Sequence, residues 1–116
     1  MKKILILGTA LLCGFLCRVA AQGVEFRDLT FGQALEQART ENKLVFMDCY
    51  TSWCGPCKNM LKNVFTLPEA GEFMNAHFVC VKYDMEKGEG IGLKKQFAVR
   101  AFPTFFIIRP DGTVQH

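Results

Sequence analysis

The sequence has no hydrophobic run long enough to span a membrane, no internal repeat and no low-complexity segment. Its most apolar stretch, residues 4–17, is shorter than the roughly 20 residues that a membrane-spanning helix needs. The 116 residues leave room for one domain, and no change in composition marks a second one. These absences argue against a transmembrane protein, a repeat array and a multidomain chain.

The first 21 residues have the pattern of a secretory signal peptide. Two lysines precede the apolar stretch, and Val19 and Ala21 supply small residues where a signal peptidase reads them. A membrane anchor is the alternative, but the stretch is short for one. A lipoprotein signal would place a small residue before a cysteine, whereas leucine precedes both Cys13 and Cys17. We therefore predict cleavage after Ala21, a mature domain of residues 22–116 and no stable membrane insertion after cleavage.

Neither sign of charge is in excess in the predicted mature chain. The full sequence has 14 Lys and Arg residues against 11 Asp and Glu residues, and three of the basic residues lie in the predicted signal peptide. The remaining charges balance, so charge gives no reason to expect nucleic acid or an acidic partner. Ten of the 11 phenylalanines follow the predicted signal, which is ample for a small core.

Alternating helical and strand patterns predict an α/β domain with a mixed central sheet. Residues 44–50 form a near-continuous apolar run of strand length, as in a strand covered on both faces. Thr30 and Gln33 fit a capping box at the start of a helix. Further strands are expected at 24–29, 78–84 and 104–108, with a return strand that begins at 113 after the turn 109–112. Helices are expected at 31–40, 58–65 and 68–77, with one more short helix that ends near 97.

Four cysteines follow the predicted cleavage site: Cys49, Cys54, Cys57 and Cys80. Export would place them where disulfides persist, although they are too few for a disulfide-stapled scaffold. Cys54 and Cys57 flank a Gly-Pro pair, directly after a predicted buried strand and at the start of a helix. Unpaired N–H groups and positive partial charge at a helix start stabilise a thiolate, which makes Cys54 a nucleophile. Cys57, one turn inside the helix, is expected to be more buried and to resolve the mixed disulfide.

Two other uses of this cysteine pair stay open on the residues alone. A static staple between Cys54 and Cys57 would close a very small loop, which constrains the unfolded chain little. A zinc site would combine the pair with His77 and Cys80, at ligand-like spacing, although Cys80 lies in mid-strand and such ligands usually lie on turns. Cys49 and Cys80 are predicted to be buried packing residues that form no disulfide with each other.

The run SWCGPCK, with a strand before it and a helix after it, resembles the active-site signature of the thioredoxin family, and AFPTF resembles that family's cis-proline loop. The resemblance covers about residues 26–115 and is strongest to exported, periplasmic thioredoxin-like proteins of the thiol:disulfide interchange type. It implies the thioredoxin fold, a mixed central sheet flanked by helices, although the chain ends at His116, before the last helix of that fold. It also implies a redox disulfide between Cys54 and Cys57.

The resemblance assigns roles to neighbouring residues. Asp48 matches a buried acid beneath the disulfide, which would exchange a proton with Cys57. Lys82 matches a lysine near that acid, with a solvated strand residue as the other interpretation. Trp53 would shield the disulfide and offer flat contact area to a partner, with core packing as the alternative. A docking groove for an extended peptide, next to a cis bond before the proline, would be bordered by Gly55, Pro56, Ala101, Phe102 and Pro103.

Together these assignments predict a periplasmic thiol:disulfide oxidoreductase that needs no metal or organic cofactor. The Gly-Pro pair between the cysteines resembles reducing members of the family, so we expect a reductase of protein disulfides supplied by a membrane thiol electron donor. An oxidase or isomerase is the alternative within this class, and a binding module without redox turnover is the alternative outside it. Phe102 stands where the family often has a smaller aliphatic residue, which would tune the choice of partner.

Overall fold

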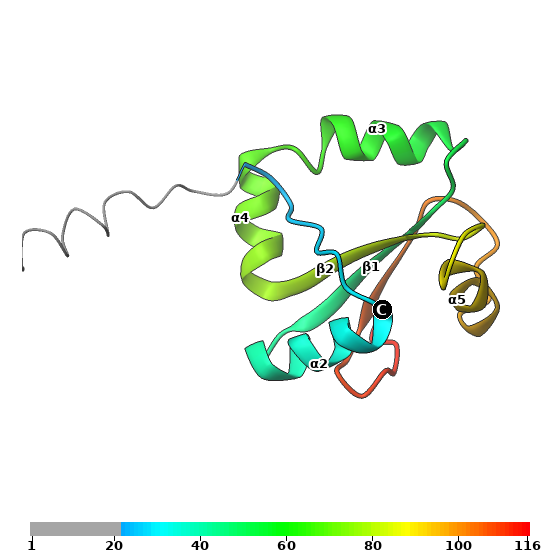
Figure 1. Cartoon of the computed structure of the whole chain (residues 1–116). Coiled ribbons are helices and arrows are strands. Elements are labelled where there is room, and N and C mark those ends of the chain that lie inside the picture. The colour runs from blue at the N-terminus through cyan, green and yellow to red at the C-terminus, as the bar shows by residue number, and fades with distance from the viewer. Residues whose placement is uncertain (1–21) are drawn as a thin grey trace, which may run out of the picture.

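The computed structural model describes residues 22–116, and the predicted signal peptide with Cys13, Cys17 and its cleavage site lies outside the described residues. The centre of the domain is a three-stranded sheet with the order β2–β1–β3 (Figure 1). β1 (Leu44–Tyr50) pairs parallel with β2 (Phe78–Asp84) and antiparallel with β3 (Thr104–Ile108). The predicted mixed sheet is confirmed, and these three strands have the predicted bounds.

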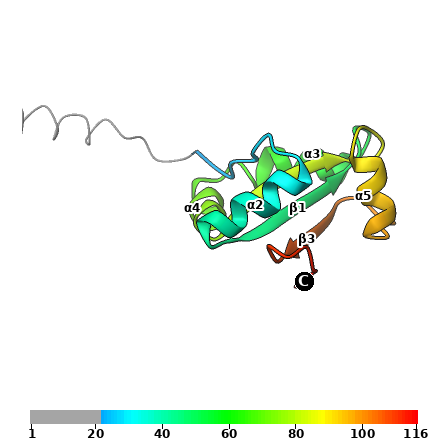
Figure 2. The ribbon, with the colours of Figure 1, turned by 60° about the horizontal axis from the view of Figure 1, so that its bottom comes forward.

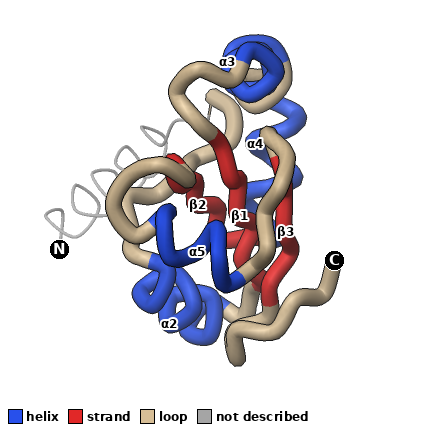
Figure 3. The backbone as a smooth tube through the Cα atoms, turned by 90° about the vertical axis from the view of Figure 1, so that its right-hand side faces the viewer, coloured by secondary structure: helices blue, strands red, loops and turns tan. Residues whose placement is uncertain are grey.

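Helices cover both faces of this sheet (Figures 1 and 3). α2 (Phe31–Glu41) and α5 (Gly90–Gln96) pack on one face, and α3 (Gly55–Asn63) and α4 (Pro68–His77) pack on the other. A strand between two helical layers must be apolar on both sides, and the five central residues of β1 are all buried. The predicted fold class, a mixed α/β sheet flanked by helices, is confirmed.

Side chains that alternate along β1 divide the core into two clusters. Val45, Met47 and Cys49 contribute to the cluster under α2 and α5, whereas Phe46 lies with Cys80 in the cluster under α3 and α4. Cys49 and Cys80 are free, buried thiols in different clusters. The prediction that these two cysteines form no disulfide with each other is therefore confirmed.

The expected strand at 24–29 is wrong, because only Phe26 bridges to a strand, at Cys80 of β2. Only the Arg27 N–H bonds to the sheet, at the Cys80 carbonyl, whereas the N–H groups of Val24 and Glu25 bond outside it. The Val24 N–H, for example, donates to the Phe65 carbonyl over 2.7 Å. An extended segment whose N–H groups are taken elsewhere cannot continue a ladder.

Local signals predict the helices well. The capping box is present, with the Gln33 N–H donating to Thr30 Oγ1 over 3.1 Å and the Thr30 N–H donating to Gln33 Oε1 over 3.0 Å. α3 begins at Gly55, before the predicted start at 58, because Pro56 is tolerated in its first turn. No helix within residues 22–116 is both long and apolar enough to cross a membrane.

The chain turns back after β3 and runs along its outer edge (Figure 2). The Gly112 N–H donates to the Arg109 carbonyl over 2.8 Å, as expected for a tight turn. The return strand that the sequence predicts consists of one bridge, between Ile108 and Val114. The Gln115 N–H donates to the carbonyl of Ile107, which precedes Ile108 in β3.

Candidate active site

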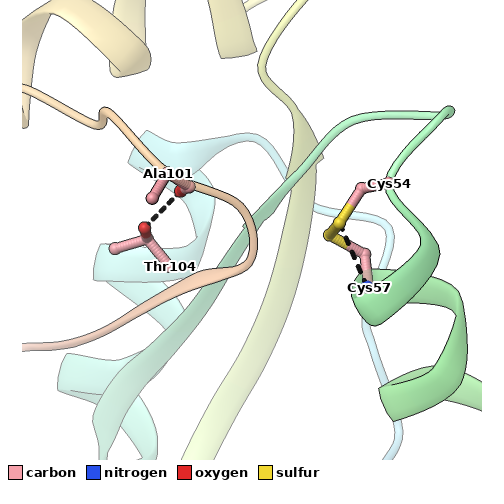
Figure 4. Close-up of a disulfide and its surroundings, with 4 residues drawn as sticks. All are labelled: Cys54, Cys57, Ala101 and Thr104. Carbon is pink, nitrogen blue, oxygen red and sulfur yellow. Dashed lines mark hydrogen bonds between the residues drawn. A yellow bond between two sulfur atoms is a disulfide. The ribbon is translucent and has the colours of Figure 1, made fainter.

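The predicted disulfide between Cys54 and Cys57 is present at the start of α3, with the two Cα atoms 5.3 Å apart (Figure 4). Cys54 is the N-cap residue, and its Sγ accepts the backbone N–H of Cys57 over 3.1 Å. A thiolate formed at Cys54 on reduction would lie at the positive end of the helix dipole, beside a donor that is already directed at its sulfur. The local structure thus favours charge on Cys54.

The two cysteines are equally buried, with 3% of each residue exposed. The expectation that Cys57 would be the more buried of the two is wrong for this oxidised form. Because the Sγ of Cys54 is directed back at the first turn of α3, the disulfide withdraws it from solvent together with Cys57. Gly55 and Pro56, which lie between them, are exposed, so a partner protein would meet this part of the loop first.

The peptide bond between Phe102 and Pro103 is cis, in agreement with the resemblance. Thr104 Oγ1 donates to the carbonyl of Ala101 over 2.5 Å and closes the turn around the proline (Figure 4). The ring of Phe102 lies edge-on to that of Trp53, with centroids 5.9 Å apart. This contact joins the proline loop to the loop that carries Cys54.

Trp53 is 64% exposed, so the alternative of core packing is wrong. Its Nε1 donates to Glu86 Oε1 over 3.0 Å, and Glu86 in turn lies in the loop between β2 and α5. The Glu86 N–H donates to Asp84 Oδ1 over 2.9 Å, which fixes that loop. The indole therefore stands as a held, flat surface next to Cys54. Sequence reasoning missed Glu86, because a single acid after a strand is not a distinctive signal.

Asp48 is only 1% exposed, so the alternative of an acid at the strand end that reaches solvent is wrong. It alternates with Met47 and so lies on the face of β1 that α3 covers. Burial raises the pKa of Asp48 to about 6, and the positive charge of Lys82 opposes the rise. A carboxyl group with this pKa can both accept and return a proton near neutral pH.

Lys82 is the register partner of Asp48 on β2 and is half-buried. Its Nζ lies 5.6 Å from the ring centroid of Phe26 and 5.8 Å from that of Tyr50. The interpretation of Lys82 as a freely solvated strand residue does not fit this enclosure. Sequence reasoning missed both rings, since Phe26 comes from a segment far from Lys82 in the chain.

The four side chains of the zinc alternative are not brought together. Within residues 22–116 no group of three or more His, Cys, Asp or Glu side chains could hold a metal ion. His77 is exposed beside Phe73, with ring centroids 4.5 Å apart, while Cys80 is buried in the core. Burial raises the pKa of Cys49 and of Cys80 to about 12, so both thiols stay protonated, as expected for packing residues.

Comparisons with known proteins agree with this geometry. A family model described as Thioredox_DsbH, a protein of unknown function (DUF255), matches residues 10–101. Among solved structures, the chain is similar to the solution structure of a candidate disulphide-isomerase from Bacteroides thetaiotaomicron. The two share 48% sequence identity and a TM-score of 0.72, over 83% of this chain and 79% of that one.

Curated relatives match over shorter parts of their own length. Thioredoxin-2 of Pyricularia oryzae is 32% identical over 95 residues, which are 82% of this chain and 52% of the relative. Thiol:disulfide interchange protein DsbD of Pseudomonas fluorescens is 31% identical over 81 residues, which are 69% of this chain and 14% of the relative. The chain thus spans about half the length of the first relative and a small part of the second. Because the family match covers residues 10–101, most of the chain, the chain belongs to the thioredoxin-like family.

Proposed function

We propose that this protein is a thiol:disulfide oxidoreductase of the cell envelope that reduces disulfides of exported proteins. The observation that carries the proposal is the disulfide between the N-cap residue of α3 and a residue in its first turn, beside the cis-proline loop. A pair in this position can alternate between dithiol and disulfide, because the helix start stabilises the thiolate that does the attack.

In the proposed reaction the reduced protein supplies two electrons. The Cys54 thiolate attacks one sulfur of a substrate disulfide, forms a mixed disulfide and releases the other substrate sulfur as a thiolate that takes up a proton. Cys57, deprotonated by Asp48, then attacks the Sγ of Cys54. This closes the Cys54–Cys57 disulfide and releases the second substrate thiol. A dithiol donor must then reduce the protein again, and we propose a membrane thiol carrier for this step.

Trp53, Gly55, Pro56, Phe102 and Pro103 are the proposed docking surface. The exposure of Trp53, and its edge-on contact with Phe102, support an apolar platform next to the sulfur atoms. An extended peptide laid across this platform would bring its disulfide to Cys54 and meet the backbone of the proline loop. Phe102 adds a ring to the platform and so favours substrates with apolar side chains near their cysteines.

The periplasmic location is also part of the proposal. It is supported by the predicted signal peptide and by the similarity to a thiol:disulfide interchange protein. Fractionation of cells that express the full chain tests it, with N-terminal sequencing of the product. We expect a periplasmic protein that begins at Gln22, and a cytoplasmic chain that begins at Met1 would contradict the assignment.

Insulin reduction by the dithiothreitol-reduced protein tests the activity. Wild type should accelerate precipitation of the insulin chains, Cys54→Ser should be at the background rate, and Cys57→Ser should accumulate a mixed disulfide that non-reducing electrophoresis detects. Equal rates for wild type and Cys54→Ser would favour a binding module without redox turnover.

The similarity to the candidate disulphide-isomerase from Bacteroides thetaiotaomicron favours an isomerase as the second candidate. Equilibration with glutathione separates the two candidates. A reductase should have a potential near the thioredoxin value of about −270 mV, whereas a value near about −180 mV would favour an isomerase. Reactivation of scrambled ribonuclease is the matching functional assay.

A further inference from the structure

The ammonium group of Lys82 is enclosed by aromatic rings instead of carboxylates. Its Nζ is within 6 Å of the ring centroids of Phe26 and Tyr50, the range of cation–π attraction. Among residues 22–116 the ion pairs involve Arg27 and Lys43 with Glu41, and none involves Lys82. The lysine is therefore held in place while its charge stays available to a third group.

That third group is Asp48. It is the register partner of Lys82, on the same face of neighbouring strands that run about 4.8 Å apart. Its Oδ1 is buried without a hydrogen-bond partner among the described side chains and backbone. A buried carboxylate in this position depends on a nearby positive charge to stay ionised, and Lys82 is the charged residue that acts on it.

We propose that Phe26 and Tyr50 are positioning residues, which hold the ammonium group of Lys82 beside Asp48 and so keep that carboxylate charged. In the proposed reaction this lets Asp48 take the proton of Cys57, and this last step rests on the proposed function. The rings themselves touch neither substrate nor sulfur in this assignment.

Aromatic rings suit this task for a physical reason. A second carboxylate beside Lys82 would compete with Asp48 for its charge, whereas a ring attracts the ammonium group and leaves the charge intact. Both rings are themselves fixed. Tyr50 ends β1, and Phe26 packs edge-on against Phe65 with centroids 5.2 Å apart, next to its bridge to β2.

Few other ionisable groups share this side of the sheet. Tyr50 follows Asp48 on the same face of β1, and Asp84 follows Lys82 on β2, while β3 places Phe105 opposite Asp48. On α3 the Cys57 sulfur is oxidised, and Lys58 and Lys62 are exposed to solvent. Burial and Lys82 are the two causes that shift the pKa of Asp48, so moving Lys82 should be visible in that pKa.

Titration of the Asp48 carboxyl carbon by NMR, in the oxidised protein, tests the proposal without any need for turnover. Lys82→Met should raise the pKa of Asp48 by about one unit, and Tyr50→Leu, which removes the ring, should raise it by about half a unit. Tyr50→Phe keeps the ring and should leave the pKa as in wild type. In the Lys82→Met background, Tyr50→Leu should cause no further change.

Two results would overturn the assignment. The first is an unchanged Asp48 pKa in Tyr50→Leu, and the second is an equal rise with and without Lys82, which would mean that the ring acts on Asp48 directly. Should Tyr50→Leu not fold, Phe26→Leu removes the other ring from an independent segment and is read in the same way. If the protein is inactive in the insulin assay but the variants show the expected pKa values of Asp48, the proposed function is contradicted and the positioning role of the rings is retained.

Discussion

At the residue scale, the site combines the Cys54–Cys57 disulfide with the buried carboxyl group of Asp48, whose ionisation lowers the stability of the folded protein. Asp48 is almost fully buried on β1, and the folded-state pKa of about 6 lies above the usual 3.8. The folded protein therefore holds this proton more tightly than the unfolded chain does. The resulting penalty on stability is complete above pH 6 and disappears as the pH falls through 6 toward about 4.

Asp48→Asn should remove this penalty. We expect the oxidised variant to be more stable than wild type by up to about 3 kcal/mol near pH 7.5, and by much less near pH 4.5. Urea unfolding at the two pH values measures the difference. Asp28→Asn, at an exposed carboxyl, is the control and should change stability by less than about 0.5 kcal/mol. A variant less stable than wild type at pH 7.5 would contradict the assignment of a buried, poorly compensated carboxylate.

Glu86 should matter for substrate binding through its hydrogen bond to Trp53. Glu86→Leu removes the acceptor and should raise the KM for a peptide disulfide roughly two- to ten-fold, with kcat nearly unchanged, since one hydrogen bond contributes about 1 kcal/mol. Glu86→Gln keeps an acceptor oxygen and should stay near wild type. A Gln variant as impaired as the Leu variant would show that charge, and not the hydrogen bond, is what counts.

Site residues that are marked by their neighbours in the sequence could be predicted. Site residues that reach the site only through tertiary contacts could not. Cys54 and Cys57 were predictable because strand, Cys-Gly-Pro-Cys and helix follow one another directly. Glu86 is 33 positions from Trp53, and nothing in its local sequence marks the partnership. The burial of Cys54 was also missed, because it depends on the direction in which its sulfur turns once the disulfide closes.

At the element scale, the predicted strands and helices are confirmed where the sequence pattern indicates burial. The prediction is wrong where the hydrogen-bond partners of the backbone determine whether a segment forms a strand. The run at 44–50 is apolar except for Asp48, as expected for a strand between helices on both faces. The segment 24–29 also has strand-like residues. However, Gly23 and Glu25 bond to the side chain of Asn75 in α4, which directs the segment toward a helix.

α4 should tolerate no side chain at Gly71, because a Cβ there would overlap the backbone of Gly23. We expect Gly71→Ala to destabilise the protein by about 1–3 kcal/mol, as overpacking does. Gly32→Ala in α2 is the matched control. A Cβ at Gly32 has open space around it, so this variant should be neutral or more stable by up to about 1 kcal/mol. Chemical unfolding of both variants makes the comparison, and equal effects would refute the close approach of α4 to the N-terminal segment.

At the scale of the whole molecule, the features of the site gather at one end of the sheet. The carboxyl ends of the parallel strands β1 and β2 lie together, and the antiparallel strand β3 begins at that same end. The loops that carry Trp53, Glu86 and Phe102 therefore meet there. The sheet topology thus explains how three segments distant in sequence form one surface.

The balance of charge over residues 22–116 predicts weak electrostatic steering. With 11 basic residues left against 11 acidic ones, after the three in the predicted signal peptide, substrates should meet little long-range field. We expect kcat/KM for a neutral peptide disulfide to change less than about two-fold when salt is raised from about 50 to 500 mM. A steep decline with salt would reveal a local field that the balanced total conceals.

Trp53 has one more consequence, because it is the single tryptophan of the sequence and immediately precedes Cys54. Every photon of indole fluorescence from this protein originates beside the disulfide. The molecule therefore carries a built-in optical reporter, and opening of the disulfide, arrival of a partner or loss of the Glu86 contact can each be followed in real time without a label.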